Sequence, residues 1–213
     1  MIVSGDMEPV IRYLQGIGAK GSVTTMVAGE READSAATIT LGLAEALQSL
    51  GARVLMIDAG ISNPTLHPLL QFDAAPGLVE VTRGTSTLAE TVHPVGHSEG
   101  LDLLTVGAID DLDHEHPESW IRAASFERML NEARLQYHTI LVTGGSLAAS
   151  VPIPELAPLT DGLIISTDRK AGQLADPLLH DLLADFPTPT LELLSAPSIG
   201  VASPRVSSSA AGG

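Results

Sequence analysis

The sequence predicts a doubly wound α/β domain, with a mostly parallel sheet and helices on both of its faces. Short runs of β-branched and aliphatic residues alternate along the chain with longer amphipathic stretches, which is typical of βαβ units. The clearest of these runs, residues 54–57, is apolar at every position, which is typical of strands that are buried on both faces of a sheet. Aromatic residues make up only 3% of the chain, and its 213 residues suffice for one such domain.

The first strand is expected at residues 22–27 (SVTTMV), which are rich in β-branched residues and bounded by glycines. A helix is predicted at residues 35–50 because apolar residues recur there at three- and four-residue spacing. Asp34 is expected to cap the start of this helix and Gly51 to end it. Residues 53–58 (RVLMID) should then form a strand covered on both faces.

The alternation continues to residue 194. Strands are predicted at residues 101–106, 139–143, 162–167 and 190–194, and helices at about residues 120–136 and 171–185. Residues 195–213 are rich in Ser, Pro, Ala and Gly and too poor in apolar residues to pack against a core. We therefore expect one domain over residues 1–194 and a disordered tail over residues 195–213.

The charge and composition argue against binding to nucleic acid, insertion into a membrane and secretion. A formal charge of −15, from 11 basic and 26 acidic residues, repels nucleic acid and anionic lipid within a Debye length of about 8 Å. The chain has no cysteine, no apolar run of about 20 residues, and no basic start of a signal peptide. We expect a cytoplasmic protein without direct nucleic-acid binding or membrane insertion, whose recruitment to the inner membrane would depend on a partner.

Residues 51–92 (GARVLMIDAGISNPTLHPLLQFDAAPGLVEVTRGTSTLAETV) resemble the second strand and following segment of bacterial tyrosine kinases that regulate capsule and exopolysaccharide export. Further segments recur in the order and spacing of this family at residues 100–109, 117–145 and 155–167. The resemblance covers about residues 22–185 and implies the fold of MinD/ParA-like P-loop ATPases. PTLHPLL at residues 64–70 and PGL at residues 76–78 favour this branch over the cell-division and partition ATPases.

The loop that should bind phosphate is degenerate. A P-loop needs glycines, a lysine that reaches the phosphates and a Ser or Thr hydroxyl for Mg²⁺, placed between the first strand and its helix. That loop here is residues 28–38 (AGEREADSAAT), which contain no lysine. Glu30, Glu32 and Asp34 place negative charge where phosphate would lie, and Arg31 alone cannot offset three carboxylates. One carboxylate about 4 Å from a phosphate charge costs about 4 kcal/mol at an effective dielectric of about 20.

The acidic residues of the family's nucleotide site are also mostly absent. By the resemblance, an acidic pair should follow the second strand, and this chain keeps Asp58 but has Gly60 at the second position. Thr143 aligns with the family's Mg²⁺-linked aspartate, and a neutral hydroxyl cannot hold Mg²⁺ as a carboxylate does. The acidic run at residues 110–118 has no zinc-motif spacing. No catalytic residue and no metal ligand is therefore assigned.

Two regulatory features of the family are weak in this chain. The family carries an autophosphorylated tyrosine cluster in its tail, whereas the two tyrosines here are Tyr13 and Tyr137. The family's N-terminal acidic and arginine motif, which serves ring assembly, is represented by Glu8 and Arg12, with Gln15 where a second arginine is expected. We therefore expect no autokinase activity, ring assembly lacks support, and a homo-oligomer stays among the possible assemblies.

These observations predict a catalytically inactive pseudo-ATPase or pseudokinase that serves as a regulatory or adaptor subunit in exopolysaccharide or capsule synthesis and export, without a cofactor. The resemblance implies a membrane-embedded chain-length or export protein, or an active kinase homologue, as its partner. One alternative is a divergent kinase or ATPase that binds ATP and Mg²⁺, and another is a partition- or pilus-type positioning protein on the same fold. The degenerate nucleotide site would comprise Gly29, Glu30, Arg31, Ser35, Asp58 and Thr143.

Overall fold

The computed structural model describes residues 2–3, 8–17, 21–30, 33–61, 63–96, 99–109, 121–146, 153–167 and 190–194. Its strands are β1 (Ile2–Val3), β2 (Val23–Gly29), β3 (Val54–Asp58), β4 (Val92–Pro94), β5 (Leu101–Leu104), β6 (Thr139–Ser146), β7 (Gly162–Thr167) and β8 (Thr190–Leu194). They form one sheet in the order β1-β8-β7-β2-β6-β3-β5-β4. Every neighbouring pair is parallel except β4 and β5, which confirms the predicted doubly wound, mostly parallel sheet.

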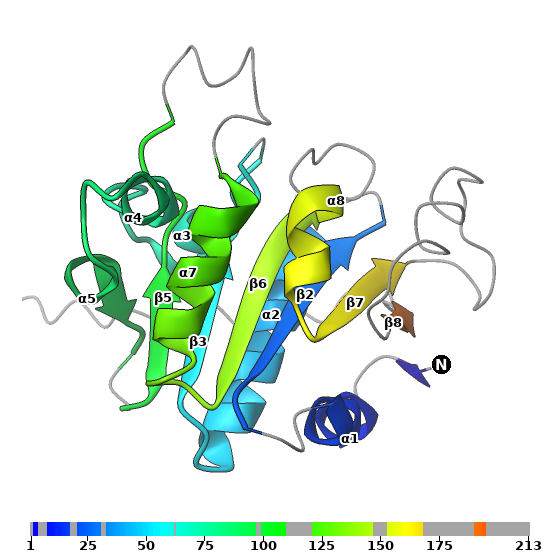
Figure 1. The fold of residues 1–213 in the computed structure, drawn as a ribbon. Coiled ribbons are helices and arrows are strands. Elements are labelled where there is room, and N and C mark those ends of the chain that lie inside the picture. The colour runs from blue at the N-terminus through cyan, green and yellow to red at the C-terminus, as the bar shows by residue number, and fades with distance from the viewer. Residues whose placement is uncertain are drawn as a thin grey trace, which may run out of the picture.

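Helices cover both faces of this sheet. They are α1 (Glu8–Ile17), α2 (Ala33–Ser49), α3 (Leu66–Leu70), α4 (Leu78–Arg83), α5 (Leu88–Thr91), α7 (Ala123–Ala133) and α8 (Ile153–Leu156), with a 3₁₀ turn, η2, at Ala157–Leu159. Figure 1 looks onto the face covered by α7 and α8, with α2 behind the sheet. Of the helices in the described part of the chain, none is long and apolar enough to cross a membrane.

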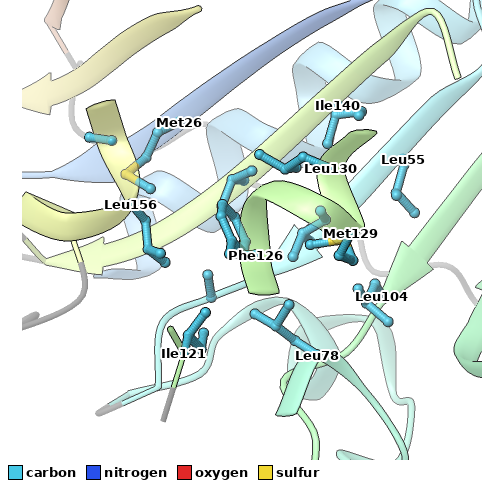
Figure 2. Close-up of a cluster of buried hydrophobic side chains, with 14 of the residues drawn as sticks. Met26, Leu55, Leu78, Leu104, Ile121, Phe126, Met129, Leu130, Ile140 and Leu156 are labelled. Atoms are coloured by element: carbon cyan, nitrogen blue, oxygen red, sulfur yellow. The ribbon is translucent and has the colours of Figure 1, made fainter. Parts of the chain in front are cut away.

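The two faces bury separate apolar clusters because successive side chains of a strand point to opposite faces. Phe126 of α7 and Leu156 of α8 pack on the first face together with Met26 of β2 (Figure 2). The next residue of β2, Val27, packs on the second face against Leu43 of α2. All of these side chains are nearly or fully buried. The continuous apolar runs of the central strands therefore reflect a sheet that is covered twice.

Several predicted bounds agree with the structure and others need correction. Gly51 follows α2 with φ of +86°, the left-handed conformation expected of a residue that ends a helix. α2 begins at Ala33, ahead of Asp34, so Asp34 lies within the first turn and does not precede the helix as predicted. β5 ends at Leu104, two residues earlier than expected. The predicted helix at residues 171–185 and the predicted tail at residues 195–213 lie outside the described residues.

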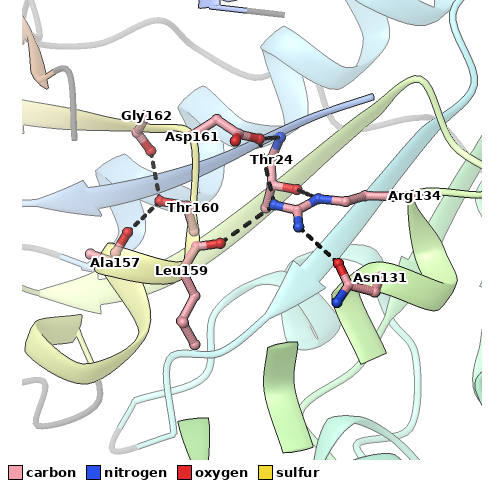
Figure 3. Close-up of polar contacts among 8 residues, drawn as sticks. All are labelled: Thr24, Asn131, Arg134, Ala157, Leu159, Thr160, Asp161 and Gly162. Carbon is pink, nitrogen blue, oxygen red and sulfur yellow. Dashed lines mark hydrogen bonds and ion pairs between the residues drawn. The ribbon is translucent and has the colours of Figure 1, made fainter. Parts of the chain in front are cut away.

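Arg134, at the end of α7, joins three elements at the amino edge of the sheet (Figure 3). Its Nε donates to Thr24 Oγ1 at 3.1 Å, and its Nη1 donates to Asn131 Oδ1 at 3.1 Å. Its Nη2 lies 3.4 Å from the Leu159 carbonyl oxygen and 3.5 Å from Asp161 Oδ2. The same Asp161 oxygen accepts from the backbone N–H of Thr24 at 2.8 Å. This guanidinium therefore ties α7 to the starts of β2 and β7.

Replacing Arg134 with alanine is expected to lower the free energy of unfolding by about 1–3 kcal/mol, because partly buried hydrogen-bond partners lose their donor. The free energy of unfolding should be measured by urea denaturation. The control is Arg128→Ala, because Arg128 lies on the same helix and is exposed. An exposed position should change stability by no more than about 0.5 kcal/mol. Equal losses in the two variants would contradict a structural role for the Arg134 contacts.

Candidate functional site

The predicted site residues that the structure describes lie toward the carboxyl ends of the central strands and at the start of α2. α2 connects β2 to β3 across one face of the sheet, and α8 lies between β6 and β7 on the other. The connections therefore reverse direction next to β2, which is where doubly wound folds bind ligands. Asp58, the last residue of β3, is the register partner of Thr143, which lies three residues before the end of β6 and not at the end of a strand as predicted. Gly29 ends β2 and is followed by Glu30.

Asp58 is fully buried and caps a neighbouring helix. Its Oδ2 accepts from the backbone N–H groups of Leu66 at 3.0 Å and His67 at 3.2 Å, the first two residues of α3. The same oxygen lies 3.2 Å from His67 Nδ1. Its Oδ1 has no hydrogen-bond partner among the described residues. The retained carboxylate is thus engaged with α3 and His67 within the protein.

The Thr143 side chain forms a hydrogen bond with a hydroxyl of α2. Its Oγ1 donates to Thr40 Oγ1 at 3.1 Å, and both residues are fully buried between β6 and α2. A threonine pair supplies no charge for a divalent cation, which prefers carboxylate ligands. Within the described ranges, no three His, Cys, Asp or Glu side chains are grouped as metal ligands.

At Gly60, where the second acid was expected, the backbone leaves little room. A Cβ on this residue would lie 3.1 Å from the Asn63 carbonyl oxygen and 3.5 Å from Gly145 Cα. Gly145 itself has φ of +76°, a conformation that favours glycine. The N–H of Ala59 also donates to the Thr143 carbonyl at 2.9 Å, so the segment that follows β3 lies directly against the last residues of β6.

The segment between β2 and α2 begins with a buried acid. Glu30 is 4% exposed, and its N–H donates to the Ser166 carbonyl of β7 at 2.8 Å. The first turns of α2 carry buried Ala36 and Ala37, at the helix start where a P-loop places its lysine and hydroxyl. The structure describes only the backbone of Ser35, in the first turn of α2, and Arg31 lies outside the described residues.

Both tyrosines lie near the amino ends of strands, at the edge opposite Asp58. Tyr137 donates its hydroxyl to Asp102 Oδ2 at 3.0 Å, and burial followed by the charge of Asp102 raises the pKa of Tyr137. Tyr13 of α1 packs against Gly162 at the start of β7. Burial raises the pKa of Tyr13 to about 12, opposed in part by a backbone hydrogen bond with Leu163. Both phenols are therefore half-buried groups held by contacts within the fold.

The raised pKa of Tyr13 predicts a loss of stability at high pH. The folded protein holds this proton more tightly than the unfolded chain, whose ordinary value is 10.0. The contribution is therefore complete below pH 10.0 and is lost as the pH rises toward 12. Urea unfolding at about pH 9 and about pH 11 should show a smaller drop in Tyr13→Phe than in the unchanged protein. An equal decrease in the free energy of unfolding in both proteins would argue against a raised pKa of Tyr13.

On the exposed side of α1, Glu8 and Arg12 pair with each other. Arg12 Nη2 donates to Glu8 Oε1 at 2.6 Å, and the side chains of Arg12 and Glu8 are 77% and 72% exposed. An exposed pair at this spacing contributes about 0.3–0.5 kcal/mol to a helix. The two residues compared above with the ring-assembly motif are thus on the surface and bonded to one another, which neither tests nor excludes an oligomer.

Comparison with known proteins gives both a family and a fold. The model of the family described as cellulose biosynthesis protein BcsQ matches residues 23–171. The succinoglycan biosynthesis transport protein ExoP of Rhizobium meliloti is 27% identical over 144 residues, which are 67% of this chain and 18% of ExoP. The tyrosine-protein kinase ptk of Acinetobacter johnsonii is 30% identical over 131 residues, which are 60% of this chain and 16% of that kinase. The chain thus spans less than a fifth of either relative.

Solved structures agree with the predicted fold. The kinase domain of the Escherichia coli tyrosine kinase ETK matches with a TM-score of 0.73 and 15% identity, covering 92% of this chain and 74% of that one. The septum site-determining protein MinD of Pyrococcus horikoshii, solved with Mg-ADP, matches with a TM-score of 0.63 and 18% identity, covering 81% and 69%. The chain therefore has the fold of bacterial tyrosine-kinase domains and MinD-type ATPases.

Proposed function

The chain belongs to the family of the cellulose biosynthesis protein BcsQ, and from this premise we propose that it is a catalytically inactive member, a pseudo-ATPase. In this proposal it serves as a regulatory or adaptor subunit in the synthesis or export of an exopolysaccharide. The fold is that of nucleotide-binding relatives, whereas the carboxyl edge of the sheet lacks the lysine and two of the carboxylates expected of a nucleotide site. The protein would then act through contacts that this edge and the helices around it make with other proteins.

One observation supports the proposal: Asp58 Oδ2 and Thr143 Oγ1, at the carboxyl edge of the sheet, are bonded within the protein. Asp58 caps α3, and Thr143 is paired with Thr40. Phosphate binding at this edge needs free N–H groups and a cation, and Mg²⁺ needs carboxylate oxygens. Glu30 instead contributes a buried acid at the start of the loop, and alanines occupy the start of α2. This arrangement favours a site that is complete without nucleotide.

The relatives suggest a kind of partner, which is part of the same proposal. ExoP is named for succinoglycan transport and ptk for tyrosine phosphorylation, and each is more than five times as long as the region that it shares with this chain. We therefore propose a membrane-embedded chain-length or export protein, or an active kinase homologue, as the partner. Neither phenol described above is freely available as a phosphate acceptor, since Tyr137 is bonded to Asp102 and Tyr13 packs on Gly162.

The test is thermal unfolding with millimolar ATP and Mg²⁺, for which we expect no saturable rise in the melting temperature. A ligand that binds only the folded state at 100 times its dissociation constant would stabilise it by about 2.7 kcal/mol, which is readily seen. Mg²⁺ alone is the control, and calorimetric titration of the same samples gives a second measurement. A saturable rise that Arg31→Glu abolishes would instead favour the divergent ATP-binding enzyme.

A further inference from the structure

Asp161 and Gly162, at the start of β7, form the one Asp-Gly or Asn-Gly pair in the sequence. Among aspartate dipeptides this pair is the most prone to backbone rearrangement, because glycine has no side chain to shield its nitrogen. The side-chain carbon Cγ of the aspartate and the backbone nitrogen of the glycine can close a five-membered ring. The Asp161 side chain is 42% exposed, so water reaches its carboxyl group.

Contacts with β2 and α7 depend on the aspartate of this pair. Its Oδ2 accepts from the Thr24 N–H at 2.8 Å and lies 3.5 Å from Arg134 Nη2 (Figure 3). Its own N–H donates to the Thr24 carbonyl at 2.7 Å. Asp161 thus bonds both backbone groups of Thr24, one residue ahead of the register between β2 and β7. Loss of this carboxylate would leave the Thr24 N–H and Arg134 without their acceptor.

Contacts with α1 depend on the glycine. A Cβ on Gly162 would lie 2.6 Å from Tyr13 Oη and 2.7 Å from Ile17 Cδ1. Both side chains belong to α1, and Gly162 is buried where they pack. Any side chain at this position would therefore force Tyr13 and Ile17 to move. The labile pair is thus maintained by contacts on both of its members.

The same contacts restrain the rearrangement. Ring closure requires the Asp161 side chain to rotate away from Thr24 and Arg134 toward the Gly162 nitrogen. The backbone around the reacting peptide is bonded as well, because Thr160 Oγ1 donates to the Gly162 carbonyl at 3.1 Å. Ring closure therefore needs the start of β7 to open, and such local openings occur without global unfolding.

We propose that the Asp161-Gly162 pair is a site of isoaspartate formation, whose rate is set by local opening of β7 and which Arg134 holds closed. In the open state the Gly162 nitrogen attacks Asp161 Cγ and loses its proton, and one carboxyl oxygen leaves as water, which gives a succinimide. Water then adds to the former main-chain carbonyl of Asp161 and opens the ring. The main chain now runs through Cβ and Cγ. One water molecule is lost and one is regained, and nothing is oxidised or reduced.

The product changes the sheet next to its central strand. Isoaspartate adds one carbon atom to the main chain between the amide of Asp161 and that of Gly162. The bond from the Asp161 N–H to Thr24 and the register of Gly162 with Thr25 can then no longer both be kept. The isomerised chain should therefore unfold more readily than the original one.

Incubation of the full chain at neutral pH and physiological temperature tests the proposal. Isoaspartate at residue 161 is measured by peptide mapping with mass spectrometry, and a synthetic peptide of residues 157–166 gives the unrestrained rate. The folded chain should react at least about tenfold more slowly than the peptide, and Arg134→Ala should raise its rate by about tenfold or more. Arg128→Ala, exposed on the same helix, should match the unchanged chain, and Asp161→Glu should abolish the product.

Gly77→Ala separates local opening from global unfolding, because its steric overlap lies at Thr105 and Gly107, away from β7. This variant should leave the rate near that of the unchanged chain. An increase equal to that of Arg134→Ala would overturn the proposal. So would a folded chain that reacts as fast as the peptide, or no product in the unchanged chain and Arg134→Ala while the peptide converts.

Low concentrations of denaturant keep the test decisive where Arg134→Ala folds poorly, because they act on the unchanged chain. Local opening exposes little surface, so the rate of isoaspartate formation should be insensitive to them. A rate that rises in proportion to the globally unfolded fraction would contradict the proposal.

Discussion

The Gly77→Ala variant is expected to lose about 2–4 kcal/mol of its free energy of unfolding, because overpacking against backbone that cannot move costs up to this amount. A Cβ at Gly77 would overlap the Thr105 carbonyl oxygen and lie 2.5 Å from the Gly107 nitrogen and 2.6 Å from Thr105 Oγ1. These atoms are fixed, since the N–H groups of Leu78 and Val79 donate to the carbonyls of Thr105 and Val106 at 2.8 and 3.0 Å.

Other glycines of the chain provide matched controls for this prediction. Gly16 lies within α1 with nothing near its Cβ position, so Gly16→Ala should raise stability by up to about 1 kcal/mol. Gly84 also has open space but a φ of +77°, so Gly84→Ala should cost about 1 kcal/mol through backbone strain alone. Urea denaturation of the three variants separates steric overlap from conformational preference. Similar losses in all three would contradict the overlap at Gly77.

The central sheet could be predicted because its strands are buried on both faces. Val54–Asp58 is apolar up to its last residue, and all five residues are buried. This strand could therefore be predicted without knowing which helices cover it or how it pairs with its neighbours. The short helices were missed for the opposite reason. α4 has six residues and is held by Glu80, which accepts from the N–H groups of Gly77 at 2.7 Å and Ala108 at 3.0 Å. Such an element depends on contacts that its own periodicity does not reveal.

The meeting of Asp58 and Thr143 at one edge of the sheet could likewise be predicted, but the bonds that these side chains make could not. Asp58 and Thr143 end two predicted strands, so their meeting at one edge follows from a parallel sheet. Thr40 lies 103 residues before Thr143, and its pairing with that residue depends on how α2 lies on the sheet. The contact of His67 with Asp58 likewise depends on the turn between β3 and α3, which the sequence does not reveal.

Removal of the Asp58 carboxylate distinguishes a structural acid from a functional one. Asp58→Ala is expected to lower the free energy of unfolding by about 2–4 kcal/mol, because two backbone N–H groups and His67 lose a charged acceptor in the interior. Asp58→Asn should lose less, since its amide oxygen can still accept from Leu66. Urea denaturation measures both changes, and Asp73→Ala serves as the control because Asp73 is exposed.

The sign of the stability change on Asp58→Ala separates these two roles. An acid kept for ligand binding is usually retained against stability, so its removal leaves the fold unchanged or makes it more stable. Asp58 Oδ1, buried without a partner among the described residues, is a cost of that kind, while the three contacts of Oδ2 act in the other direction. Hydrogen bonds to a charged group contribute about 1.5–3 kcal/mol each, so we expect the Oδ2 contacts to dominate. A gain in stability on Asp58→Ala would show that this acid is held for a ligand and would argue against an erased nucleotide site.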